Sequence, residues 1–225
     1  MATHKSTTLD EAERFVRLLG TVAGAATLGA IAQGMWSGWR RPKGRATGRA
    51  GVVLQVPVYV VGGLAYFGLC LALWRPIRFT LPAAARAATL VAGGLLYFPG
   101  LALVLWGRLA QGEMYNVSSG LGVQLYANHR LVTHGPYALV RHPVYLGLRL
   151  AALGGLLVYR TWTFAFLALN SLALAVRAGR EEEALAVQFG AQWAAYSRIV
   201  PAWIPRPRYW STRCSLGHGP PTRTV

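Results

Sequence analysis

Apolar residues form three long, uninterrupted runs in the first half of the chain. No charged residue occurs between Arg17 and Arg40, over 51–74 or over 87–106. Each run is close to the roughly 20 apolar residues that a helix needs to cross the hydrocarbon layer of a membrane. Each also ends in tryptophan, which is typical of the membrane–water interface. The pattern predicts three membrane-spanning helices over 17–40, 51–74 and 87–106.

The second half of the chain is more polar and predicts a different arrangement. Residues 107–144 carry too many polar side chains to span a membrane. Two shorter apolar stretches follow over 144–159 and 161–176, with Arg160 between them, and we interpret them as a helical hairpin. The polar segment that begins at Arg177 has a helical pattern to about residue 197, followed by prolines that stop a helix.

These elements together predict an all-α integral membrane protein with five membrane helices: three full spans and a C-terminal helical hairpin. We expect three regions, with transmembrane helices over 1–106, a second region with the hairpin over 107–205 and a basic flexible tail over 206–225. A signal peptide cleaved near 30–32 is disfavoured, because three acids stand at 10–13, where its leader should be basic.

Composition supports a membrane protein and excludes two other classes. The 225 residues are 54% hydrophobic and only 13% charged, whereas about 25% of the residues in a soluble domain are charged. Eight tryptophans and ten tyrosines exclude intrinsic disorder.

The net charge of +16 is interpreted as a topology signal. The segments 40–50, 107–144 and 177–225 hold 15 of the 23 lysines and arginines. If these segments share one side of the membrane, the positive-inside rule places that side in the cytoplasm. We therefore expect an inner membrane of the bacterial type, a cytoplasmic C-terminus and no nucleic-acid partner.

Acidic residues are scarce, so their positions are informative. Three of the seven are consecutive, at 181–183, where the polar segment begins. Arg177 lies four residues before Glu181, which puts both on one helix face. Such a pair at the membrane surface can hold ligand groups of opposite sign. A simple ion pair, or acids that oppose the dipole at a helix start, would give the same spacing.

A second polar cluster lies over 129–147. Gly135-Pro136 predicts a turn, and Pro143 suits the first turn of a helix that begins after His142. Tyr145 shares the face of that helix with His142. The three histidines of this cluster have spacings of five and eight and no acid or cysteine among them, so no metal is expected.

Arg149 interrupts the first apolar stretch of the hairpin. An ionisable residue in a membrane helix is a functional hypothesis by default, and Arg149 could bind a carboxylate or phosphate of a substrate. Alternatively, its long stem carries the charge to the membrane surface.

Both clusters resemble the motifs of the isoprenylcysteine carboxyl methyltransferases and their phospholipid methyltransferase relatives. The first motif is His-x-Leu-Val-Thr-x-Gly-Pro-Tyr followed by Val-Arg-His-Pro-x-Tyr-x-Gly. The second comprises Arg177, Glu181, Glu182, Leu185, Phe189, Gly190, Tyr196, Val200, Pro201, Ile204 and Pro205. The likeness covers about 107–205. A third acid, Glu183, follows the usual pair, but Leu185 and Phe189 favour Glu181 and Glu182 as that pair.

The resemblance implies an integral membrane enzyme that uses S-adenosyl-L-methionine in a cytosolic pocket. It assigns cofactor binding to His129, Arg130, Leu131, Val132, Tyr137, His142, Pro143, Val144, Tyr145, Glu181 and Glu182. It assigns catalysis to Arg177, Glu181 and His142, with Arg177 at the acceptor, and Arg149 is a further candidate for acceptor binding. The implied acceptor is lipophilic or membrane-associated: the carboxylate of an isoprenyl-type compound or a lipid head group.

Two other functions stay open. The C-terminal half is distantly similar to membrane sterol or enone reductases that use NADPH, and Trp193 favours that relationship. The His-Pro-x-Tyr-x-Gly run and the short chain favour the methyltransferase. A non-catalytic membrane protein of the same fold is the other alternative.

Overall fold

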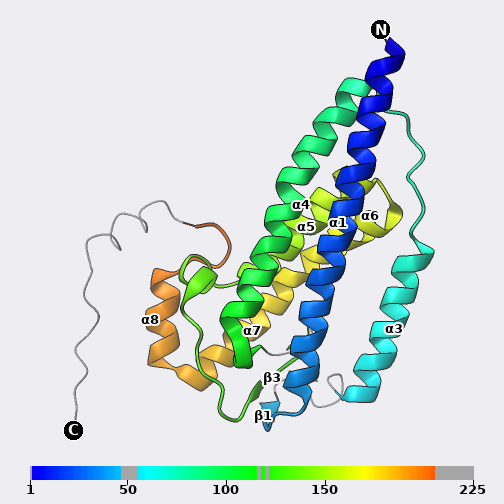
Figure 1. Cartoon of the computed structure of the whole chain (residues 1–225). Coiled ribbons are helices and arrows are strands. Elements are labelled where there is room, and N and C mark those ends of the chain that lie inside the picture. The colour runs from blue at the N-terminus through cyan, green and yellow to red at the C-terminus, as the bar shows by residue number, and fades with distance from the viewer. Residues whose placement is uncertain (1, 47–54, 116–117, 120–121, 206–225) are drawn as a thin grey trace.

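The computed structural model describes residues 2–46, 55–115, 118–119 and 122–205 (Figure 1). Within these ranges the chain is mostly helical. The helices are α1 (Ala2–Trp39), α3 (Val56–Ala72), α4 (Ala83–Gln111), α5 (Pro143–Tyr159), α6 (Trp162–Asn170), α7 (Leu174–Phe189) and α8 (Ala191–Ile199). Short 3-10 turns are η1 (Gly112–Met114), η2 (Gly135–Ala138) and η3 (Ser171–Ala173).

Three helical segments of the described chain are long and apolar enough to cross a membrane: Thr8–Trp39, Ala83–Met114 and Trp162–Phe189. The first two coincide with the predicted spans over 17–40 and 87–106. The third combines α6, η3 and α7. It therefore joins the second half of the predicted hairpin to the polar segment after Arg177, because the helix continues where the sequence turns from apolar to charged.

The predicted span over 51–74 corresponds to α3, and its residues 51–54 lie outside the described part of the chain. Helix α3 has 17 residues and exposes large apolar side chains such as Leu64 and Leu71. Helix α5, also of 17 residues, ends at Tyr159, and the left-handed backbone of Arg160 (φ 53°) makes the turn into α6. Five membrane helices stay a prediction.

Close packing of α4 against α5 depends on glycine. A Cβ added at Gly100 would lie 2.6 Å from the backbone nitrogen of Ala151, and one at Gly147 would lie 2.6 Å from the Gly100 carbonyl oxygen. Small residues allow such close approach of helices in lipid, where van der Waals packing drives association. This packing fixes the start of α5, which carries His142 and Tyr145, against α4.

The prediction of an all-α chain omitted a small sheet. Strands β1 (Lys43–Ala46), β2 (Ser118–Ser119) and β3 (Gly122–Tyr126) form an antiparallel sheet in the order β1-β3-β2. Val123 and Leu125 alternate along β3 and are buried against Ala184 of α7. Because the strands are so short, their alternation is a weak sequence signal, and their pairing depends on contacts between distant segments.

The described parts of the polar segments gather at one end of the molecule (Figure 1). There β1 pairs with β3, α7 packs on β3, and Arg41 forms an ion pair with Glu113 at 3.1 Å. The segments that were grouped by their basic residues therefore lie together. Their cytoplasmic orientation stays a prediction.

Candidate active site

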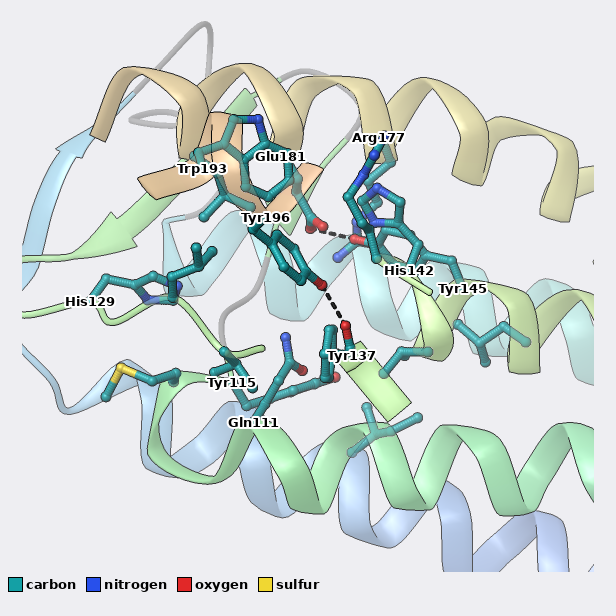
Figure 2. A pocket seen from close by; sticks show the side chains of 18 of the residues that line it. Gln111, Tyr115, His129, Tyr137, His142, Tyr145, Arg177, Glu181, Trp193 and Tyr196 are labelled. Carbon is teal, nitrogen blue, oxygen red and sulfur yellow. Dashed lines mark hydrogen bonds between the residues drawn. The ribbon is translucent and has the colours of Figure 1, made fainter. Parts of the chain in front are cut away.

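A cavity of about 200 Å³ lies at this polar end (Figure 2). Its wall comes from α1, the end of α4, the segment 129–137, the start of α5, and helices α7 and α8. It brings together nine of the residues that the sequence assigned to the site: His129, Leu131, Val132, Tyr137, His142, Val144, Tyr145, Arg177 and Glu181.

His129 begins the extended segment that leaves β3. Its backbone N–H donates to the Tyr126 carbonyl at 3.2 Å. Burial lowers the pKa of the imidazole to about 4, so the ring is neutral near pH 7. Its Nδ1 atom is buried without a hydrogen-bond partner among the described residues. A buried polar atom without a partner beside a cavity is well suited to bind a ligand.

Tyr137 lies in η2, where Gly135 takes a positive φ of 60° to make the turn. Burial, together with the negative charge of Glu181, raises the pKa of the Tyr137 hydroxyl well above its usual range. The Tyr137 carbonyl accepts a hydrogen bond of 2.7 Å from the Tyr196 hydroxyl, which ties α8 over the cavity (Figure 2).

The start of α5 is held by the C-terminal segment. The backbone N–H groups of Arg141 and His142 donate to the carbonyls of Pro201 (2.9 Å) and Ala202 (3.2 Å). The His142 ring is stacked on Tyr145, with 5.8 Å between centroids, and contacts Trp203 at 5.3 Å. His142 is therefore fixed on both sides.

Glu181 faces the cavity. It accepts a short hydrogen bond from the Tyr145 hydroxyl (Figure 2). The Arg177 guanidinium lies over the Tyr145 ring, 5.4 Å from its centroid. Arg177 and Glu181 thus flank the ring that also contacts His142, and the two sequence motifs meet at Tyr145.

The structure places Glu182, also assigned to cofactor binding, beside Arg141 and His142. Glu182 does not line the cavity and instead receives Nε and Nη2 of Arg141, both at 3.0 Å. His142 Nε2 donates to the same carboxylate at 2.7 Å. Glu183 is exposed. Adjacent positions on a helix point about 100° apart, so only one of the three acids faces the cavity.

Three further assigned residues lie away from the cavity lining. The Arg130 side chain is exposed, although its backbone N–H donates to Met114 Sδ at 3.2 Å. Pro143 is fully buried. Arg149 donates from Nε to the Ser171 carbonyl at 3.2 Å, and its guanidinium lies 5.0 Å from the Trp203 ring centroid. Arg149 does not line this cavity and forms no ion pair with an acidic residue in the described ranges.

The cavity also includes residues that the sequence did not assign to the site, although Leu185 and Tyr196 belong to the second motif: Ile31, Met35, Gln111, Met114, Tyr115, Arg141, Leu148, Leu185, Trp193 and Tyr196. Arg141 belongs to the Val-Arg-His-Pro motif, which was the available signal. Its Nη1 donates to the carbonyls of Ser197 and Val200, both at 2.9 Å. Ile31 and Met35 are ordinary apolar positions of a long helix, and nothing in the sequence distinguishes them.

A second cavity, of about 500 Å³, lies among α1, α3, α4, α5 and α6. Its lining is mainly apolar, with residues such as Leu28, Phe67 and Leu101. Ile31 and Leu148 line both cavities. The polar cavity and the apolar cavity are therefore neighbours, separated at this point by two aliphatic side chains.

Comparison with known families gives a match over the middle of the chain. Residues 95–187 match the isoprenylcysteine carboxyl methyltransferase family. The resemblance inferred from the motifs is thereby confirmed, and the matched segment runs from α4 into α7. None of the curated proteins matches the chain. The family and the three apolar helices indicate an integral membrane methyltransferase. Among the described residues no group of three or more His, Cys, Asp or Glu is arranged to hold a metal ion.

Proposed function

We propose that the chain transfers a methyl group from S-adenosyl-L-methionine to a lipophilic or membrane-associated acceptor. The acceptor is the carboxylate of an isoprenyl-type compound or a lipid head group. The observation that carries this proposal is that His142, which precedes α5, and Tyr145 of α5 meet Arg177 and Glu181 of α7 in one cavity, at the polar end of apolar helices.

The cavity lining fits the chemistry of the donor. The donor combines a base and ribose with a zwitterionic amino acid and a sulfonium. Leu131 and Val132 offer apolar surface for the adenosine part, and His129 Nδ1 lacks a partner among the described residues. Glu181 offers carboxylate oxygen to the ammonium group or the ribose hydroxyls. These residues would hold the donor through complementary contacts.

When bound, the donor supplies an electrophilic methyl group, and the protein mainly has to align the two reactants. Correct alignment can contribute about 7–11 kcal/mol to lowering a barrier. Arg141 and Glu182 hold His142, while Tyr145 holds Glu181. We assign catalysis to His142, Arg177 and Glu181, with Arg177 orienting the acceptor. Trp193 and Tyr196 of α8 line the cavity and would exclude water from the bound reactants.

The apolar cavity suits the acceptor. Its common boundary with the polar cavity at Ile31 and Leu148 allows the apolar part of an acceptor to lie among the helices while its reactive group reaches the donor. Arg149 follows Leu148 and would bind an anionic group of the acceptor beside this boundary. We propose that this end of the protein faces the cytoplasm of a bacterial-type inner membrane.

Transfer of a labelled methyl group from the donor into a membrane lipid extract tests this function. We expect labelled lipid. Base should release the label if the product is a methyl ester, and the label should stay on the lipid if a nitrogen or sulfur is methylated. Glu181→Ala should abolish labelling, whereas Glu183→Ala, a change of the exposed neighbour, should preserve it.

A parallel titration of the purified protein with NADPH tests the alternative enzyme class. Binding of NADPH without methyl transfer would favour the reductase. The absence of both methyl transfer and NADPH binding would favour a non-catalytic membrane protein.

A further inference from the structure

Arg108 is a buried cation behind the wall of the polar cavity. Its side chain belongs to a residue only 8% exposed and forms no ion pair with a described residue. Nη1 donates to the Gly112 carbonyl at 3.1 Å and Nη2 to Gln33 Oε1 at 3.0 Å, whereas Nε is buried and has no hydrogen-bond partner in the part of the chain that the structure describes. Burial of an unpaired charge lowers stability, so we expect Arg108 to have a role that offsets this cost.

Arg108 packs against Tyr115, a cavity residue. Its guanidinium carbon lies over the Tyr115 ring, 4.6 Å from the centroid. The buried Tyr126 donates from its hydroxyl to the Tyr115 carbonyl at 2.6 Å. Ring and backbone of Tyr115 are thus held by two separate contacts. Figure 2 shows Tyr115 across the cavity from Arg177 and Glu181.

Two glycines of α1, one turn apart, make room for both contacts. A Cβ at Gly34 would collide with the Arg108 guanidinium, and one at Gly38 would collide with the Tyr126 hydroxyl. Both positions lie outside the segment 95–187 that matches the family. Helix α1 therefore supports the cavity wall through Arg108 and Tyr126, in addition to lining it with Ile31 and Met35.

We propose that Tyr115 is a further donor-binding residue and that Arg108 is the positioning residue that holds its ring in the cavity wall. This inference rests on the proposed function. Because Arg108 already places a cation on the ring, Tyr115 is a poor partner for the sulfonium. A neutral adenine can stack on the ring or contact its edge. We therefore assign Tyr115 to the adenosine part of the donor.

Calorimetric titration of the detergent-purified full chain with S-adenosylhomocysteine tests the assignment. Tyr115→Leu removes the ring and should weaken binding about tenfold, whereas Tyr115→Phe should stay within about threefold of the parent. Gly34→Ala displaces Arg108 and should also weaken binding about tenfold. Gly29→Ala is the matched control, because no atom lies within 4 Å of an added Cβ there.

Steady-state kinetics separate positioning from a merely structural role. We expect Tyr115→Leu and Gly34→Ala to raise KM for the donor and to leave kcat and KM for the acceptor nearly unchanged. The melting temperature of each variant is measured in detergent. If Gly34→Ala fails to fold, Tyr115→Leu still tests the assignment.

The outcomes distinguish the inference from the function on which it rests. If the parent binds S-adenosylhomocysteine and both variants bind it equally well, the role of Tyr115 is overturned while the proposed function stands. Lower melting temperatures with unchanged affinity also overturn it. If the parent itself does not bind, the proposed function fails and this assignment fails with it.

Discussion

Two glutamates, near opposite ends of the helices, are each held by basic side chains, yet only one lies beside a cavity. Near the start of α1, Glu13 binds Arg86 at 3.1 Å and Arg160 at 2.7 Å, and its side chain is 6% exposed. At the polar end, Glu182 binds Arg141 at 3.0 Å and His142 at 2.7 Å, with 27% exposure.

The difference lies in what surrounds each glutamate. Glu13 lines neither cavity, and its arginines connect α1 to α4 and to the α5–α6 turn. Glu182 stands behind a cavity that its neighbour Glu181 faces. A cluster of charges is therefore insufficient to identify a site. A cavity with titratable side chains and an unpaired buried atom such as His129 Nδ1 is the stronger indication.

Removal of the Glu13 carboxylate should have the largest effect on stability. Glu13→Ala leaves Arg86 and Arg160 without their common partner, and loss of one member of a buried pair costs about 3–5 kcal/mol. We expect a lower melting temperature in detergent and unchanged donor affinity of the folded protein. A Glu13→Ala variant that stays fully stable but no longer binds donor would contradict this prediction, because it would assign donor binding to the end of the molecule that carries Glu13.

Glu181→Gln should act on the reaction instead. It keeps the size of the side chain but removes the charge beside Tyr145, and we expect about a 100-fold lower kcat/KM. Melting temperature should change little. Equal loss of activity in Glu183→Gln would show that the acidic run acts through its overall charge, which contradicts a specific role for Glu181.

Arg141→Lys sharpens the comparison at the polar end. Lysine cannot reproduce the paired contact with Glu182 or the additional bonds to the Ser197 and Val200 carbonyls. We expect about a tenfold higher KM for the donor, since α8 and His142 lose a common anchor. Donor kinetics identical to the parent would mean that this network serves stability alone.

The pH dependence of stability should be the smallest effect. Burial lowers the pKa of His129 to about 4 in the folded protein, against about 6.5 when unfolded. The unfolded chain therefore binds a proton first as the pH falls, and stability decreases between about pH 6.5 and 4. We expect a loss of about 1 kcal/mol from pH 7 to pH 5.5. His129→Leu should remove this contribution, and an unchanged slope in that variant would contradict the assignment.

Local patterns predicted several parts of the molecule well. Uninterrupted apolar runs located α1 and α4, and Pro143 located the start of α5. The two motifs correctly indicated that His142, Tyr145, Arg177 and Glu181 would come together. These features are encoded in neighbouring residues, through helix periodicity and the backbone preference of proline.

Contacts between distant segments were not predictable in the same way. Three features join residues that are far apart in the chain. Glu182 pairs with Arg141, Arg108 packs against Gly34, and three short strands form the sheet. The sequence pattern predicted that a membrane helix ends at Val176, because the residues change there from apolar to polar. The helical segment 162–189 continues past this point, since helical hydrogen bonding does not depend on that change.

The central claim is that the polar cavity binds a sulfonium nucleoside donor beside Glu181. Calorimetry with S-adenosylhomocysteine on the parent, Glu181→Ala and Glu183→Ala tests this claim most directly. The account predicts dissociation constants of the order of micromolar for the parent and for Glu183→Ala, and no measurable binding for Glu181→Ala. Undiminished affinity in a folded Glu181→Ala variant would contradict it.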